Sequence, residues 1–222
     1  MDLREILLTV SIQLPGFLLG IVAHEYAHAR MAYHFGDKTA SSLGRMNLNP
    51  LSHLDPIGTV AFPLIVGIFT QFSFIFGWAK PVPINTSALT PFKKGLFWVA
   101  LAGPLMNFFL GLVSLVALAL LLSFFKKFGY TTSSQEFFSS FSQILRHSFI
   151  FNIYLAVFNL LPFPPLDGSR ILSLVLPYKY RSVLEMLERY SLGFIILLMI
   201  TNALHYLTAP FFWLGSKFLS FF

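Results

Sequence analysis

Residues 6–28 of the chain read ILLTVSIQLPGFLLGIVAHEYAH. No charged side chain lies between Glu5 and Glu25, so one helix here is long enough to cross the roughly 30 Å hydrocarbon core of a bilayer. The stretch ends on His24, Glu25 and His28, three ionisable residues within one helical turn. Placing a charged residue in a membrane costs about 2.5–3.5 kcal/mol on insertion scales, so this cluster requires a reason.

The composition of the whole chain indicates a lipid environment. Of its 222 residues, 56% are hydrophobic and 11% are charged, whereas a soluble globular domain carries about 25% charged residues. This balance excludes a soluble enzyme, a disordered chain and a nucleic-acid-binding protein. The net charge of +6 fits the excess of Lys and Arg that membrane proteins carry in their cytoplasmic loops. The length predicts a single domain.

Four more charge-free windows follow, at residues 56–79, 95–125, 147–166 and 190–216. Each reaches the length of about 20 residues that a spanning helix needs. We therefore expect an all-α polytopic membrane protein that crosses the bilayer several times. Pro210 is expected to divide the last window, because a proline in a helix interior removes a hydrogen bond.

The first window ends in a metal-binding pattern, His24-Glu25-Tyr26-Ala27-His28. Residues i and i+4 project from one face of a helix, so both imidazoles can bind one Zn²⁺, with the glutamate beside it. Zinc lowers the pKa of a bound water to about 7, and Glu25 can pass a proton from that water to a leaving amine. The alternative is a polar patch that closes the helix at the membrane interface.

A catalytic zinc site needs a third protein ligand, which must be His, Asp or Glu because the chain has no cysteine. Asp167 is the candidate. It follows the 147–166 window in the stretch Asn159-Leu-Leu-Pro-Phe-Pro-Pro-Leu-Asp167-Gly168, whose prolines cannot continue a helix. Unwound backbone at membrane depth is tolerated only inside protein or beside a watery cavity. The alternative is an aspartate that caps a helix after a proline loop.

The order of the windows constrains the topology. His24 and Asp167 can share one metal only if the first window and the 147–166 window leave the membrane on the same side. If both windows between them spanned the bilayer, Asp167 would lie on the opposite side. Residues 56–79 are least like a span, because Pro63 and two glycines interrupt them. We expect a re-entrant hairpin or a small membrane-embedded β region there. Most Lys and Arg residues then lie on the side of the site, which places it toward the cytoplasm.

At these positions the chain resembles the site-2 protease family of intramembrane zinc metalloproteases, specifically its short bacterial branch without a PDZ domain. Residues 24–28, 102–107 (AGPLMN) and 159–168 match the family in order, and residues 47–58 and 77–83 also look like this branch. The resemblance covers about residues 6–176. It implies a core of three transmembrane helices plus extra helices, with a small membrane-associated β or re-entrant region between the first two core helices. Residues 1–222 then form one membrane-embedded metalloprotease domain, with C-terminal helices at about 180–222.

The resemblance also assigns roles. It implies one Zn²⁺ per chain, held by His24, His28 and Asp167, with Glu25 as the general base. It further implies that Asn159 contacts the substrate or stabilises the oxyanion, and the alternative for this residue is an interhelical hydrogen bond.

A transmembrane substrate hides its peptide bonds in a helix, so a protease must hold an unwound segment of it. The prolines at 81 and 83 favour extended chain, and an edge strand can bind a peptide by β-addition. The alternative is a plain proline-rich connection. Asn107 follows a Gly-Pro break and is a further candidate for contact with the substrate. The alternatives are that it supports the metal ligands or that it packs between helices. The predicted substrate-binding residues are Trp78, Lys80, Pro81, Val82, Pro83 and Asn107.

The predicted function is an intramembrane zinc endopeptidase that hydrolyses peptide bonds in or near transmembrane segments. The protein is expected in the bacterial cytoplasmic membrane. Its expected partners are a transmembrane protein substrate and the lipid bilayer, and it is not expected to bind nucleic acid. Homo-oligomerisation is possible. Two alternatives are kept: a non-catalytic membrane regulatory protein of the same fold, and a metal transporter. The intact Glu25 argues against the first, and a single compact set of ligands argues against the second.

Overall fold

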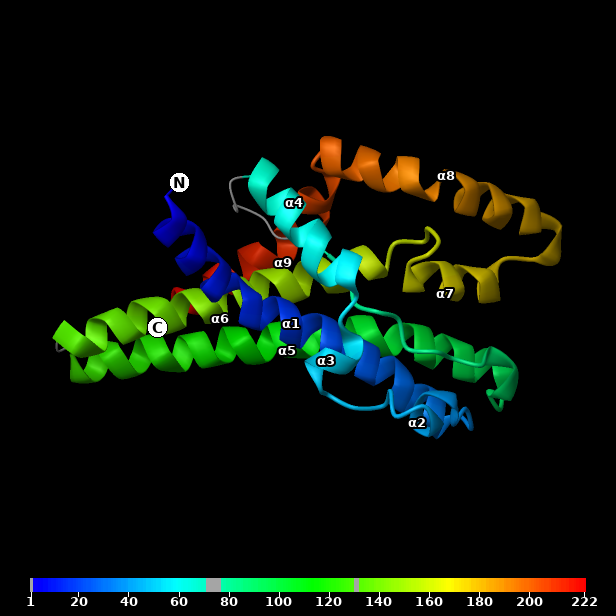
Figure 1. The fold of residues 1–222 in the computed structure, drawn as a ribbon, viewed down its shortest axis with the longest axis horizontal. Coiled ribbons are helices and arrows are strands. Elements are labelled where there is room, and N and C mark those ends of the chain that lie inside the picture. Colours follow the sequence, from blue (N-terminus) through cyan, green and yellow to red (C-terminus); the bar gives the residue numbers. More distant parts are fainter. Residues whose placement is uncertain (1, 71–76, 130–131) are drawn as a thin grey trace.

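The computed structural model describes residues 2–70, 77–129 and 132–222, and within these ranges the regular secondary structure is helical, without a strand. Three long helices form the centre: α1 (Leu3–His34), α5 (Phe92–Phe128) and α6 (Thr132–Asn159), which pack against one another (Figure 1). By length and composition, α1 and α5 can each cross a membrane. The expected all-α architecture is therefore confirmed for the described residues.

The register of the three helices follows from small residues on α1. The backbone of α6 passes so close to α1 that a Cβ on Gly16 would overlap Ser148, and one on Gly20 would contact Asn152. Glycine allows this close approach, as at many interfaces between membrane helices. Since Gly16 pairs with Ser148 and Gly20 with Asn152, α1 and α6 run parallel. Asn107 contacts Gly20 O, whereas Val99, earlier on α5, contacts His28, later on α1, so α5 runs the opposite way.

The chain between α1 and α5 forms a short returning excursion. It contains α2 (Thr39–Ser42), α3 (Pro50–His53), the π-helical turn η1 (Pro56–Ala61), α4 (Phe62–Phe69) and the 3-10 turn η2 (Thr86–Ala88). η1 and α4 form one helical stretch, Pro56–Phe69, which extends at most about 21 Å, too little to cross a bilayer. After α4, Trp78 N donates to Gly58 O at 3.0 Å, so the chain returns beside the point where it left.

This excursion brings α5 back to the end at which α1 finishes, because Thr90 N donates to Phe35 O at 2.8 Å. That is the geometry that a metal site shared with Asp167 requires. The predicted β region is not confirmed: the described residues between α1 and α5 contain helical turns and irregular chain. Part of the 56–79 window, residues 71–76, lies outside the described residues.

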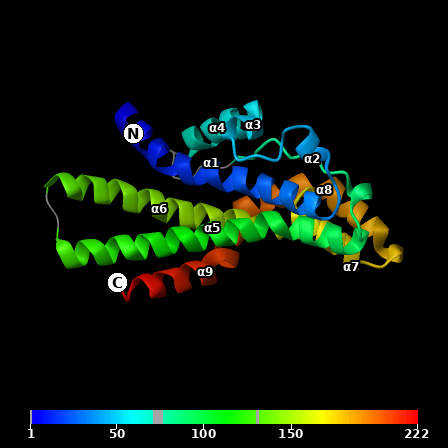
Figure 2. The same ribbon diagram turned by 90° about the horizontal axis from the view of Figure 1, so that it is seen from below.

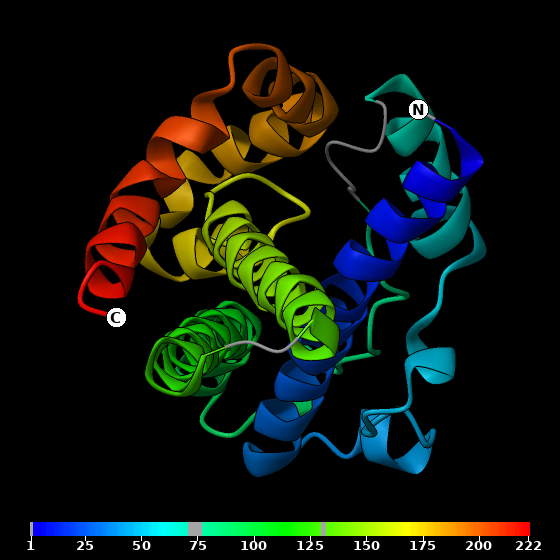
Figure 3. The same ribbon diagram turned by 90° about the vertical axis from the view of Figure 1, so that its left-hand side faces the viewer.

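The C-terminal quarter wraps the other side of the bundle. It comprises α7 (Asp167–Val175), the turn η3 (Tyr178–Tyr180), α8 (Arg181–Ile200) and α9 (Ala203–Leu219). In Figure 2, α9 lies alongside the bundle next to α5, and Figure 3 shows α6 between α9 and α1. The expected break at Pro210 is wrong, since Pro210 lies inside α9. The chain turns instead at Asn202, which adopts the left-handed conformation (φ 53°) that Asn tolerates well.

Candidate metal centre

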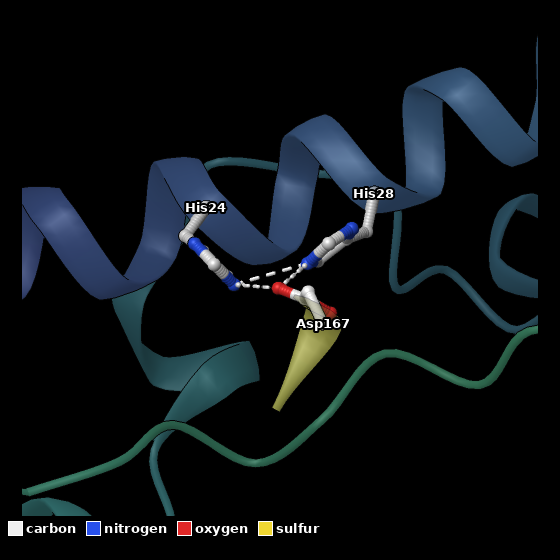
Figure 4. Close-up of side chains that lie close together, drawn as sticks. All are labelled: His24, His28 and Asp167. Carbon is white, nitrogen blue, oxygen red and sulfur yellow. Dashed lines mark hydrogen bonds and ion pairs between the residues drawn. The ribbon is translucent and has the colours of Figure 1, made fainter. Parts of the chain in front are cut away.

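The structure brings the three predicted ligands together. His24 Nε2 lies 3.0 Å from His28 Nε2, and Asp167 Oδ2 lies 3.2 Å from the first of these atoms and 3.0 Å from the second (Figure 4). All three side chains are buried, with 4–7% of each residue exposed. Both histidines project from one face of α1, and Asp167 is the first residue of α7.

The position of Asp167 depends on the turn that joins α6 to α7. The prolines between the two helices prevent α6 from continuing, and Leu166 is extended (ψ 155°). Gly168 then packs so tightly that an added Cβ would overlap the carbonyl oxygens of Leu160 and Leu161 at the end of α6. Because glycine has no Cβ, α7 can begin directly against α6, and Asp167 is held beside α1.

A chain of buried hydrogen bonds orients His24. Asn107 Nδ2 donates to Gly20 O at 3.0 Å and to Asn152 Oδ1 at 2.9 Å, so Asn107 Oδ1 is left to face His24 Nδ1 at 2.7 Å. A carbonyl oxygen can only accept, so Nδ1 of the neutral imidazole carries the proton and Nε2 presents a lone pair. Asn107 and Asn152 are fully buried.

His28 is oriented in the same way by backbone. Its Nδ1 lies 2.7 Å from Val99 O, which can only accept, so Nε2 again presents a lone pair. Two imidazole lone pairs and the Asp167 carboxylate therefore converge within 3.2 Å of one another. Three electron-pair donors without a donated proton repel one another unless a cation lies between them.

The triangle of ligand atoms fits zinc. Tetrahedral zinc with bonds of about 2.0–2.1 Å to its ligands separates neighbouring ligand atoms by about 3.3 Å. The observed separations of 3.0–3.2 Å are close to this. A metal cation between the three ligand atoms would favour the ionised form of the Asp167 carboxylate.

Glu25 lies beside an irregular segment of the excursion, residues 77–85 (the 77–85 segment). Val82 N donates to Glu25 Oε2 at 2.7 Å, so the predicted base and the predicted substrate-binding residues are neighbours. Arg45 Nη2 donates to Lys80 O at 3.0 Å, and Asn85 N donates to Asp37 Oδ2 at 2.7 Å. The segment is thus tied to α1 and to the loop after it, from both sides of Val82.

The other predicted site residues, Trp78, Asn159 and Asn107, lie outside the triangle of ligand atoms. Trp78 closes the excursion against Gly58, and its ring packs at a tilt of 48° against Phe62, with ring centroids 5.1 Å apart. Asn159 Nδ2 donates one turn back to Leu155 O at 2.9 Å, and its role toward a substrate stays a prediction. Asn107 was a candidate for substrate, but its full burial and its contact with His24 match the alternative of supporting a ligand.

Two residues at the centre were not singled out from the sequence. A Cβ on Gly103 would overlap Nε2 of both histidines, so α5 presents bare backbone to the metal site. Asn152 completes the hydrogen-bond chain to His24 through Asn107. A polar amide inside an apolar window was the available signal for Asn152, because such residues are rare in membrane helices and have partners there.

The fold and the site define a helical protein with apolar helices suited to a membrane and a buried centre that could hold zinc. The chain belongs to peptidase family M50, the site-2 protease family, whose model matches residues 13–201. The family and the two apolar helices indicate that the chain associates with a membrane.

Curated relatives agree with this assignment. The chain is 36% identical over 185 residues to "Putative zinc metalloprotease YwhC" of Bacillus subtilis (strain 168). The matched region covers 82% of this chain and 76% of that protein. It is 29% identical over 192 residues to "Putative zinc metalloprotease Rip2" of Mycolicibacterium smegmatis, and this matched region covers 86% of this chain and 68% of that protein. No solved structure matches the chain significantly. Family and relatives together indicate a zinc metalloprotease.

Proposed function

We propose that the chain is an intramembrane zinc endopeptidase, which hydrolyses peptide bonds in or near the transmembrane segments of other membrane proteins. The observation that carries the proposal is the convergence of His24, His28 and Asp167, with Glu25 next to the first ligand, on a helix apolar enough to lie in a bilayer. Soluble substrates have no need of a site built into such a helix.

The roles follow from the geometry. His24, His28 and Asp167 would hold zinc, which when bound supplies a Lewis acid that polarises the scissile carbonyl and makes water more acidic. Glu25 takes a proton from the attacking water and delivers it to the departing amide nitrogen. Asn107 keeps His24 in the tautomer that binds metal, and Asn159 is proposed to face the substrate or the oxyanion.

The 77–85 segment is proposed to hold the unwound substrate. Its support is the contact between Val82 N and Glu25, which places the segment next to the base. Pro81 and Pro83 have no N–H, so Val82 is the backbone donor in this part of the segment. A substrate carbonyl would compete with Glu25 for that N–H, and Trp78 and Lys80 would flank the bound peptide.

The proposed setting is a bacterial cytoplasmic membrane, crossed by α1, α5 and α6, with the site toward the cytoplasm. Its support is the charge distribution: Arg30 and Lys94 lie where α1 ends and α5 begins, the end at which the metal centre lies. The proposed partners are a transmembrane protein substrate and the lipid bilayer.

The test replaces only the base. Cells that carry the wild-type chain or Glu25→Gln are compared by quantitative proteomics of their membranes, and zinc is measured in both purified proteins. Because Gln is close in size to Glu and is not a proposed ligand, the variant should keep its zinc. A protease predicts that one or more intact membrane proteins accumulate, with loss of their shorter forms, in the variant.

The alternatives give different results. A regulatory protein without catalysis predicts identical membrane proteomes, because the fold is unchanged. A metal transporter predicts that zinc uptake into vesicles containing the protein persists in Glu25→Gln, without any proteolytic product. Either result would exclude the endopeptidase.

A further inference from the structure

A groove of about 620 Å³ runs along the seam between α1 and α5, and the proposed metal ligands and Glu25 are not among the residues that line it. Arg30 and His34 lie on its α1 wall, one helical turn apart. Lys94 and Trp98 lie on its α5 wall, also one turn apart, followed by Leu105. The proposed catalysis uses none of these side chains.

The groove has a cationic end and an apolar end. Gly95 lies against Phe35, the residue after α1, so Lys94 lies level with His34 at the end of the helix pair. Farther along the antiparallel helices, the lining becomes apolar and includes Leu105 and Met106. A single ligand that fills the groove therefore needs an anionic end and an apolar end.

No acidic side chain balances the cations. Arg30, His34 and Lys94 are exposed, and the residues that line the groove include no Asp or Glu. In the described part of the chain, neither Arg30 nor Lys94 forms an ion pair with a carboxylate, and Arg30 lies over the ring of Tyr33, 5.8 Å from its centroid. The positive charge at this end is left for an external anion.

We propose that this groove binds an anionic phospholipid, with the phosphate between Arg30 and Lys94 and an acyl chain along Leu105 and Met106. Basic pockets between membrane helices on the cytoplasmic side suit anionic head groups, and Trp98 lies at the level where aromatic side chains favour the interface. A transmembrane substrate fits less well, since the cytoplasmic flanks of membrane helices are rich in Lys and Arg and would be repelled.

The site touches the catalytic centre from behind. Ala27 and Ala102 line the groove, and their neighbours in sequence, His28 and Gly103, belong to the metal centre. A lipid bound there would bridge α1 and α5 at the level of the ligands and stabilise their packing.

The experiment measures the binding of dioctanoyl phosphatidylglycerol to the full chain, purified in a neutral detergent. Removing one interfacial cation costs about fivefold in affinity, so the double variant Arg30→Gln/Lys94→Gln should bind about thirtyfold more weakly. Lys93→Gln is the matched control, because it removes an exposed cation from the same turn of α5 that does not line the groove. Its affinity should stay within about twofold of wild type. Arg30→Lys, which keeps the charge, should largely retain binding.

Two arms use the wild-type chain alone, so the test survives a variant that fails to fold. Dioctanoyl phosphatidylcholine should bind at least tenfold more weakly, and glycerol phosphate without chains should not displace the lipid. Equal binding of both lipids, unchanged binding by a double variant that folds and keeps its zinc, or displacement by glycerol phosphate would overturn the proposal. Displacement by a transmembrane peptide with basic flanks would assign the groove to substrate instead, and would also overturn it.

Discussion

Replacing Asn107 by Ala should weaken zinc binding without touching a ligand. The change removes Asn107 Oδ1, which accepts the hydrogen bond from His24 Nδ1 at a distance of 2.7 Å between the two atoms. It also leaves Gly20 O and Asn152 Oδ1 without the donor that Asn107 Nδ2 provides at a fully buried position. His24 is then free to rotate or to carry its proton on Nε2, where a metal cannot bind. Loss of such a supporting hydrogen bond typically lowers metal affinity by about 10–100-fold, which corresponds to about 1.4–2.8 kcal/mol.

Competition for zinc with a chelator of known affinity measures the effect on purified protein. Ser114→Ala is the matched control, since Ser114 lies two turns farther along α5, is also buried, and bonds to Ser148 on α6 at 2.9 Å. Both variants lose a hydrogen bond between α5 and α6, which costs about 1 kcal/mol of stability. Only Asn107→Ala should lose zinc affinity. Equal zinc affinity in the two variants would refute the argument that Asn107 orients His24.

Three further predictions follow from close contacts. Gly103→Ala should lower zinc affinity at least tenfold, because its Cβ overlaps both ligand Nε2 atoms. Gly111→Ala on the same helix meets the flexible end of Ile153 and, at an ordinary contact distance, Phe149 O, so it should keep its zinc. Val82→Pro should abolish substrate cleavage with zinc unchanged, since it removes the N–H that contacts the base, while Val82→Ala keeps that N–H and should remain active. Gly16→Val should lower the thermal unfolding temperature through about 1–3 kcal/mol of overpacking against α6. Gly193→Ala, which meets nothing, should leave that temperature unchanged or raise it.

The convergence of His24, His28 and Asp167 could be predicted because the information that specifies these residues is local. The spacing of His24 and His28 fixes one helical face, and prolines followed by a lone carboxylate single out Asp167. His24, His28 and Asp167 can lie on one side of the bilayer only if the number of crossings between them excludes the 56–79 window. That window was therefore expected to return to the side from which it left, and α4 within it is too short to cross a bilayer.

The residues that support the ligands depend on the register between helices, which periodicity does not determine. Gly103 and Asn152 reach the centre only because α5 runs antiparallel to α1 while α6 runs parallel to it. The helix break was misplaced for a related reason. A proline inside an apolar helix can be tolerated, and α9 continues through Pro210, whereas Asn202 turns the chain in the left-handed conformation.

The stoichiometry of bound zinc tests the central claim most directly. Elemental analysis of the purified chain should find one zinc per wild-type molecule, the same in Glu25→Gln, and little or none in Asp167→Asn. Asp37→Asn is the matched control, because Asp37 is an equally buried carboxylate that binds Thr39 and Asn85 away from the ligand triangle, and it should keep its zinc. A full complement of zinc in Asp167→Asn, or none in the wild type, would contradict a metal centre built from His24, His28 and Asp167.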